Sequence, residues 1–205
     1  MKKVNVAIIG TKFMGKAHSN AWSRVNKFFD VGLEPVLKVA CGRDPEGTKD
    51  FAKTWDWEET STDWEKVVAR DDVDIIDICT PTYLHKDIFI AAAEHGKQIF
   101  CEKPAALNFA EAKEMYEAAD KAGVLHYLNH NYRRTPAISY AKQLIEEGKI
   151  GQIFHWRGTY LQDWITDPNF PLTWHLQRKF AGAGPHYDLN SHSVDIARYL
   201  VGEVY

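Results

Sequence analysis

The chain has 205 residues, of which 45% are hydrophobic and 26% are charged, and its formal net charge is -3. This length and composition are typical of a globular protein with one domain or one and a half. The small negative charge gives no basic field for nucleic acid, and no apolar run or signal-peptide pattern indicates a membrane span or export. We therefore expect a cytoplasmic protein that works on a small molecule and binds neither nucleic acid nor a membrane.

In its first half the chain alternates short apolar runs with amphipathic segments. In chain order we expect strands at 4–9, 35–41, 74–79, 98–101 and 124–128, with a short strand within 54–62, and helices at 14–28, from Pro45, from the cap Asp63, at 84–95 and at 109–122. Strand and helix repeated in this way predict an α/β fold, a doubly wound parallel sheet with right-handed crossovers.

The pattern changes after about residue 130. We expect a helix at 136–147, an aromatic strand at 152–161, a helix at 191–201 and the start of another strand at 202–205. We therefore divide the chain into a first domain, 1–129, and the beginning of a second domain, 130–205, which we expect to be truncated.

Three cysteines end apolar runs: Cys41, Cys79 and Cys101. Their number is odd and their spacing is neither that of metal ligands nor CxxC. We expect reduced, buried residues at strand ends, and no metal site.

A partial phosphate-binding motif lies between the first strand and the first helix. The segment Gly10-Thr11-Lys12-Phe13-Met14-Gly15 matches GxGxxG at its first and last glycines and carries lysine at the middle one. In the complete motif the glycines make the turn, admit a pyrophosphate and pack helix on strand, while the helix N-terminus attracts phosphate. Lys12 could offset the lost glycine with an ammonium beside the phosphates. The alternative is a turn that binds nothing.

The end of the second predicted strand carries Gly42 and Arg43 where NAD-dependent folds usually place an acid on the ribose. A missing carboxylate and an adjacent guanidinium can accommodate a 2'-phosphate, which favours NADP slightly over NAD. Alternatively, Arg43 is a solvated surface residue.

Four motifs occur in a specific order: Gly10 to His18, Cys79-Thr80-Pro81, Glu102-Lys103-Pro104 and Asp188-Leu189-Asn190-Ser191-His192. With them the whole chain resembles the Gfo/Idh/MocA family, which includes glucose-fructose oxidoreductase and inositol dehydrogenase. The resemblance implies a Rossmann domain that binds NAD or NADP, followed by an α/β domain with a large open sheet. That sheet would hold a carbohydrate or polyol substrate and form the interface of a homo-oligomer, which would be a dimer or a tetramer.

The resemblance assigns catalysis to Lys103, Asp188 and His192. Hydride leaves an alcohol carbon only as the hydroxyl proton departs, and a histidine suits the base that takes it. Asp188, four residues before His192 on a predicted helix, can orient the imidazole, and Lys103 can stabilise the developing alkoxide. Taken separately, each residue is more often structural: Lys103 as an exposed lysine at a strand end, Asp188 as a helix cap and His192 as a surface or core histidine.

Further residues are assigned to the cofactor or the substrate. The resemblance places Thr80, Pro81, His85 and Glu102 beside the bound cofactor, and His18 lies one turn into the first predicted helix. Structural capping explains His18, Thr80, Pro81 and His85 almost as well. The segment 131–134, with Arg133, and three aromatic residues, Trp164, Trp174 and His175, could reach the substrate. Core packing is the alternative for the two tryptophans. The sequence departs from the family at Pro185-His186-Tyr187, which replaces a small, glycine-rich approach and adds His186 as a second proton carrier.

These residues favour reversible oxidation of a secondary hydroxyl on a sugar, glycoside or cyclic polyol. One alternative is a lyase, epimerase or glycosidase that oxidises and re-reduces its substrate with the same cofactor. Another is a cofactor-binding regulator, against which the three catalytic residues argue.

Overall fold

The computed structural model describes residues 1–203. Contacts divide the chain into two compact units, Met1–Leu128 and Asn129–Tyr205. None of the described helices combines the length and apolar character needed to cross a lipid bilayer.

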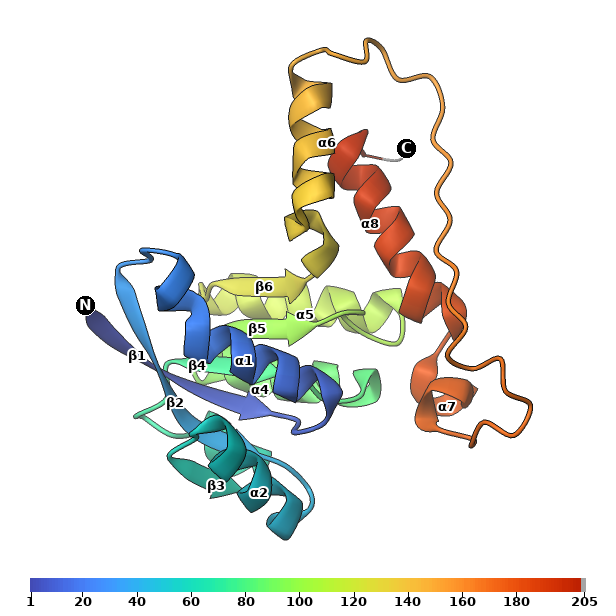
Figure 1. The fold of residues 1–205 in the computed structure, drawn as a ribbon. Coiled ribbons are helices and arrows are strands. Elements are labelled where there is room, and N and C mark those ends of the chain that lie inside the picture. Colours follow the sequence, from blue (N-terminus) through green and yellow to red (C-terminus); the bar gives the residue numbers. More distant parts are fainter. Residues whose placement is uncertain (204–205) are drawn as a thin grey trace. The chain divides into compact units, whose positions relative to one another are not determined.

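A six-stranded sheet organises the first unit (Figure 1). Its strands are β1 (Lys2–Ile9), β2 (Leu33–Cys41), β3 (Glu59–Ser61), β4 (Ile75–Ile78), β5 (Gln98–Glu102) and β6 (His126–Asn129). They lie in the order β3-β2-β1-β4-β5-β6, and the pairs from β3 to β5 are parallel. This confirms the predicted doubly wound sheet. The strand order reverses between β1 and β4, the point where such sheets bind ligands.

Helices connect the strands. They are α1 (Phe13–Phe28), α2 (Pro45–Trp55), α3 (Trp64–Val68), α4 (His85–Glu94) and α5 (Phe109–Ala122), with a 3-10 turn at Thr82–Leu84. Asp63 caps α3 as predicted, its carboxylate accepting the Lys66 N–H at 3.1 Å. Gly123 ends α5 in the left-handed conformation, where glycine carries no steric penalty.

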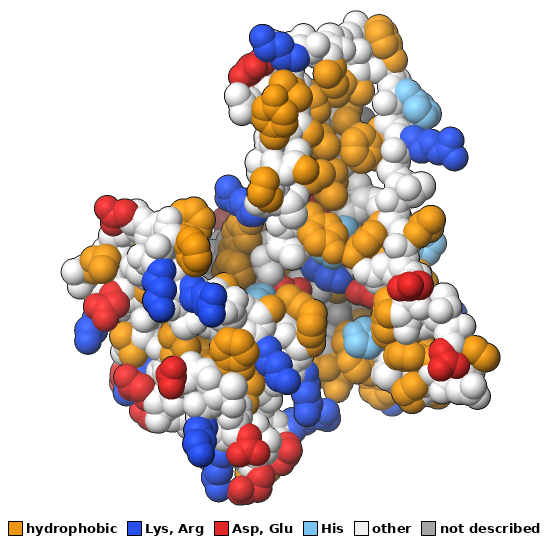
Figure 2. Space-filling model, viewed as in Figure 1, with side chains coloured by type: hydrophobic (Ala, Val, Ile, Leu, Met, Phe, Trp, Pro, Cys, Tyr) orange, Lys and Arg blue, Asp and Glu red, His pale blue; other side chains and the backbone are white. Residues whose placement is uncertain are grey.

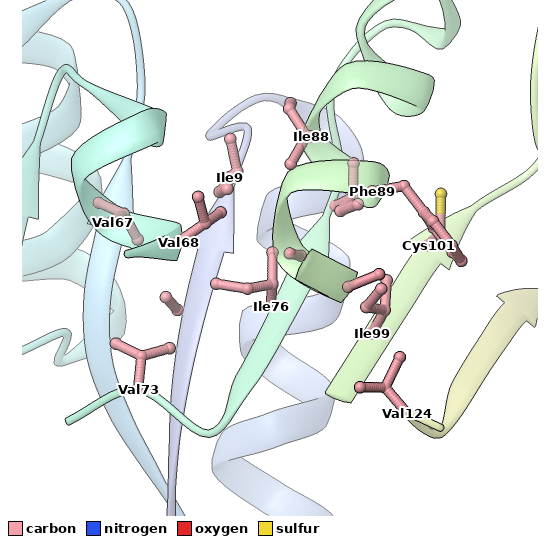
Figure 3. Packing of buried hydrophobic residues seen from close by; sticks show 14 of the residues in the cluster. Ile9, Val67, Val68, Val73, Ile76, Ile88, Phe89, Ile99, Cys101 and Val124 are labelled. Carbon is pink, nitrogen blue, oxygen red and sulfur yellow. The ribbon is translucent and has the colours of Figure 1, made fainter. Parts of the chain in front are cut away.

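Two apolar clusters cover the two faces of the sheet. Successive β1 residues point to opposite faces, so Ala7 and Ile9 join the larger cluster with α3, α4 and α5, whereas Val6 and Ile8 pack toward α1 and α2. Figure 3 shows Ile9, Ile76 and Ile88 meeting in the larger cluster. Burying each such side chain stabilises the fold by about 1.5–3 kcal/mol.

The three cysteines are free and buried, as predicted. Cys41 ends β2, Cys101 lies in β5, and Cys79 directly follows β4. Burial raises the pKa of all three thiols.

The second unit contains mainly helices. They are a 3-10 turn at Asn131–Arg134, α6 (Pro136–Glu146), a 3-10 turn at Trp174–Leu176, α7 (Arg178–Ala181), a π-helical turn at His186–Asn190 and α8 (Ser191–Leu200). Helices α6 and α8 pack together. The predicted helices 136–147 and 191–201 are thus confirmed.

The predicted strand at 152–161 is wrong. The segment has no regular secondary structure, and no strand lies within residues 130–203. A strand needs a neighbour for its backbone N–H and C=O groups, and this segment has no strand beside it. Two of the apolar residues that suggested a strand lie in solvent instead, with Phe154 86% and Leu161 90% exposed. Figure 2 shows further hydrophobic side chains gathered over α6 and α8. Residues 202 and 203 form no strand, and the rest of that predicted strand, 204–205, lies outside the described residues.

Candidate active site

A cavity of about 690 Å³ lies in the first unit where β1, β2 and β4 end. Its position is the switch point of the sheet. Seven residues that the sequence assigned to the cofactor line it: Gly10, Lys12, Phe13, Gly42, Arg43, Thr80 and Pro81.

Two glycines allow the backbone to approach closely beside this cavity. Gly10 has a φ of 113°, and a Cβ there would lie 2.4 Å from the carbonyl oxygen of Cys79. A Cβ on Gly15 would lie 2.1 Å from the carbonyl oxygen of Gly10. Gly15 therefore sets the close packing of α1 on β1, the role that the motif gives its last glycine.

The N-terminus of α1 is arranged to receive an anion. Its first turn contains no acidic residue, and Lys12 at the N-cap makes no side-chain cap hydrogen bond. The first N–H groups of a helix have no partner within it and carry partial positive charge. Lys16, one turn further along α1, also lines the cavity. Sequence reasoning missed Lys16, although its i,i+4 spacing from Lys12 was a usable signal.

The end of β2 forms a second part of the cavity. A Cβ on Gly42 would lie 2.5 Å from Thr48 Oγ1 and 2.8 Å from Thr11 Oγ1, so the backbone and these hydroxyl groups lie close together. Arg43 is exposed and lines the cavity, as does Asp44, which sequence reasoning missed. Asp44 is the N-cap residue of α2 but makes no side-chain cap hydrogen bond.

A buried hydroxyl group on the cavity wall fits a polar ligand. Thr80 Oγ1 has no hydrogen-bond partner among the described residues. Leaving such a group buried and unsatisfied costs about 1–3 kcal/mol, so a ligand that bonds it gains affinity. With the close glycines and the anion-receptive helix end, the residues present fit a dinucleotide.

The remaining predicted cofactor residues lie outside the lining. Met14 packs against the smaller apolar cluster, and Glu102 is buried at the end of β5. His85 is 1% exposed, and its Nδ1 and Nε2 lie 2.9 and 2.8 Å from the carbonyl oxygens of Pro104 and Thr80. Burial lowers the pKa of His85. The ring of His85 thus connects the loop that follows β4 with the loop that follows β5. Lys103 is half-buried in the loop that follows β5.

In the second unit, His192 lies in an aromatic enclosure at the start of α8. It is 6% exposed and stacks on Tyr132, with 4.2 Å between ring centroids. Tyr160 meets the imidazole edge-on at 5.9 Å. Asp188 lies in the π-helical turn just before α8. Because the turn is not α-helical, the i,i+4 geometry behind the predicted Asp188–His192 pairing does not apply directly, and the pairing stays a prediction.

Of the other predicted substrate residues, Arg133 is held by an ion pair and three aromatic residues pack together. Arg133 makes two hydrogen bonds with Asp195, at 2.7 and 2.5 Å, which hold its guanidinium against α8. Trp164, Trp174 and His175 come together, with His175 stacked on Trp174 at 3.7 Å and edge-on to Trp164 at 5.7 Å. The remaining residue, His186, is exposed.

Two family sequence patterns match the chain. Residues 4–130 match the Gfo/Idh/MocA oxidoreductase family with its NAD-binding Rossmann fold, and residues 138–205 match the C-terminal domain of the same family. The chain belongs to the Gfo/Idh/MocA family.

Particular Gfo/Idh/MocA proteins are similar along the whole chain. Levoglucosan dehydrogenase of Pseudarthrobacter phenanthrenivorans is 47% identical over 99% of this chain and 52% of its own length. A solved structure of levoglucosan dehydrogenase with NADH and levoglucosan superposes with a TM-score of 0.96 and 47% identity, over 98% of this chain and 55% of that one. A 2,7-anhydro-N-acetylneuraminate hydratase of Mediterraneibacter gnavus is 30% identical over 98% of this chain and 50% of its own length. The chain thus spans about half the length of these family members.

Proposed function

We propose that this chain is part of an NAD-dependent dehydrogenase that oxidises a secondary hydroxyl group of a sugar or cyclic polyol. The observation that carries the proposal is the cavity at the switch point, where close glycines, the N-terminus of α1 and the Thr80 hydroxyl fit a dinucleotide. Levoglucosan is the first substrate to test, because the similar dehydrogenase is named for it.

NAD is the cofactor that we propose. The similar structure contains NADH, and Asp44 gives the β2 end of the cavity a carboxylate that can accept hydrogen bonds from ribose hydroxyl groups. Arg43, on which the slight preference for NADP depends, lines the same cavity. The ratio of kcat/KM for the two cofactors decides between them.

The bound nicotinamide supplies the hydride acceptor. His192 takes the hydroxyl proton as the carbon loses its hydride, and Lys103 stabilises the negative charge that develops on the oxygen. Asp188 orients the imidazole of His192, the role that the family resemblance implies. The products are a ketone, NADH and the proton held on His192, which passes to solvent.

The test is NADH formation by the protein in its natural full length, with levoglucosan and scyllo-inositol as substrates. We expect His192→Ala and Lys103→Met to lower kcat by about 100-fold or more, since each removes a group acting in the transition state. The affinity for NADH should stay nearly unchanged in His192→Ala. The control is His95→Ala, which removes the exposed histidine at the C-cap of α4, away from the residues that line the cavity. Full turnover in the His192 and Lys103 variants would contradict the proposal.

The similarity to a 2,7-anhydro-N-acetylneuraminate hydratase favours a second function. Hydration involves no net oxidation, so a protein that binds NAD could carry it out by transient oxidation of the substrate followed by re-reduction. It returns the hydride to the substrate, so product forms while no net NADH accumulates. Product analysis alongside NADH absorbance separates the two functions. A regulator that binds cofactor without catalysis would form no product.

We also propose that the full protein is a homo-oligomer, a dimer or a tetramer, as its family resemblance implies. Light scattering with size-exclusion chromatography measures this mass directly.

A further inference from the structure

Three ionisable side chains meet inside the first unit, next to the loop that carries Lys103. His18 comes from α1, Asp77 from β4 and Glu102 from the end of β5. His18 Nδ1 lies 2.9 and 3.0 Å from the two carboxylate oxygens of Asp77, and His18 Nε2 lies 2.9 Å from Glu102 Oε1. They are 6%, 0% and 4% exposed respectively, and none of them lines the cofactor cavity.

The cluster contains two carboxylates and one imidazole, and its geometry favours a protonated ring. Burial by itself lowers the pKa of His18, but the hydrogen bonds with Asp77 and Glu102 outweigh burial and raise that pKa to about 10. The Trp22 indole N–H donates to the second oxygen of Asp77 at 2.7 Å. Cys79 Sγ lies 3.2 Å from His18 Nδ1, and burial raises the pKa of that thiol, so it stays neutral.

Buried ions are costly in the core of a sheet. Desolvating charged groups costs several kcal/mol each, and well-packed apolar residues often stabilise a fold equally well. A gain in net stability therefore does not explain why ionisable residues occupy this position. Their contact with the loop that carries Lys103 offers a functional explanation.

The second carboxylate oxygen of Glu102 holds the backbone of the next residue. The Lys103 N–H donates to Glu102 Oε2 at 3.1 Å, while Glu102 Oε1 faces His18. On the other side of Lys103, the carbonyl oxygen of Pro104 contacts the ring of buried His85. The backbone on both sides of Lys103 is thus fixed by a buried group.

We propose that His18, held by Asp77, is a positioning residue for Lys103, because its imidazolium fixes the Glu102 carboxylate that holds the Lys103 backbone. This inference rests on the proposed role of Lys103 at the reacting hydroxyl. It adds a chain of contacts from Asp77 on β4 through His18 on α1 to Glu102. This chain fixes the backbone position from which the Lys103 side chain extends.

The test compares His18→Gln and Asp77→Asn with Ser19→Ala in the full-length protein, using NAD and levoglucosan. Ser19 is the matched control, because it lies next to His18 on α1, is fully buried and accepts one buried hydrogen bond from Trp57 Nε1 at 3.0 Å. That bond does not lead to Lys103, so Ser19→Ala tests the loss of buried hydrogen bonding alone.

We expect His18→Gln to lower kcat by about 10- to 100-fold, the effect of an ångström-scale misplacement of a catalytic group. The dissociation constant of NADH should stay nearly unchanged. Levoglucosan deuterated on its ring carbons should give a larger primary isotope effect on kcat than in wild type, since hydride transfer becomes more rate-limiting. Asp77→Asn should show the same pattern more weakly, and Ser19→Ala should lower the melting temperature while leaving kcat and the isotope effect as in wild type.

Wild-type kcat and isotope effect in folded His18→Gln would overturn the inference. So would equal losses of kcat in His18→Gln and Ser19→Ala at equal melting temperature. Lys103→Met separates this failure from that of the proposed function. If it keeps turnover, the role of Lys103 is wrong, whereas if it loses turnover while His18→Gln does not, only the positioning role is wrong.

Discussion

The ring of Tyr132 stacks on the imidazole of His192, with 4.2 Å between the centroids and 26° between the planes. The Tyr132 hydroxyl lies 2.5 Å from that of Tyr160, and this hydrogen bond is the main cause that raises the pKa of Tyr132 to about 12. Tyr132 is therefore neutral at ordinary pH and offers His192 an aromatic face.

We expect this stack to orient the proposed base. Tyr132→Leu should lower kcat by about tenfold, since an aromatic pair contributes about 0.5–1.5 kcal/mol beyond its buried area. Tyr132→Phe keeps the ring and loses only the hydroxyl, so its kcat should stay close to wild type. Steady-state kinetics with levoglucosan measure both. If the Leu and Phe variants have the same kcat, the ring does not orient His192.

The contact between Gly15 and Gly10 predicts a packing defect. In Gly15→Ala the new Cβ meets a backbone oxygen at 2.1 Å, so α1 must move away from β1. Such overpacking costs about 1–3 kcal/mol, and the displaced helix end should also raise the dissociation constant of NADH. Fluorescence titration and thermal unfolding measure the two effects.

Gly47→Ala is the matched comparison for stability. It also adds a methyl group to a helical glycine, but the nearest atom, at 2.5 Å, belongs to the flexible carboxylate of Asp44, which can rotate away. Its melting temperature should equal or exceed that of wild type, because alanine favours a helix over glycine. A loss as large as that of Gly15→Ala would mean that backbone contact is not the cause.

The fold of the first unit could be predicted because its signals are local. Apolar runs ended by glycine, and caps such as Asp63, indicate strands and helices without knowledge of distant contacts. Segment 152–161 could not be assigned correctly, because a strand depends on a partner elsewhere in the chain.

The candidate site was predictable where a motif fixes the backbone, as at Gly10 and Gly15, and less so where a contact spans the sequence. His18 and Glu102 are 84 residues apart, so no spacing rule links them. Asp44 was overlooked because the motif specifies the residue at the end of β2, which is Gly42 here. The carboxylate that lines the cavity comes instead from Asp44, the N-cap residue of α2.

The Arg43–Asp44 pair predicts how cofactor choice can be changed. Removing the carboxylate in Asp44→Ala should raise the KM for NAD, through a lost ribose hydrogen bond, and lower the KM for NADP, through lost repulsion of the 2'-phosphate. Arg43→Ala should raise the KM for NADP and leave that for NAD nearly unchanged. Each change is expected to be about tenfold, the effect of a hydrogen bond to a charged group at about 1.5–3 kcal/mol. Identical effects on both cofactors would place these side chains away from the ribose.

The buried His18 cluster also predicts how stability depends on pH. The pKa of His18 is about 10 in the folded protein and 6.5 for the ordinary group, so the folded state binds the proton more tightly. The contribution of His18 protonation to folding, which is set against the cost of burying the cluster, is fully present below pH 6.5 and is lost as pH rises toward 10. One pKa unit corresponds to about 1.4 kcal/mol, so the free energy of unfolding should fall by a few kcal/mol across this range.

Urea unfolding at pH 6.5, 8 and 9.5, followed by tryptophan fluorescence, measures this fall in wild type and in His18→Asn. The buried thiols also lose stabilisation at high pH, because burial raises their pKa values, but both proteins retain them. The difference between the two proteins therefore isolates His18. It should be largest at pH 6.5 and shrink as the pH rises, whereas a constant difference would mean that the ring of His18 is already neutral in the folded state.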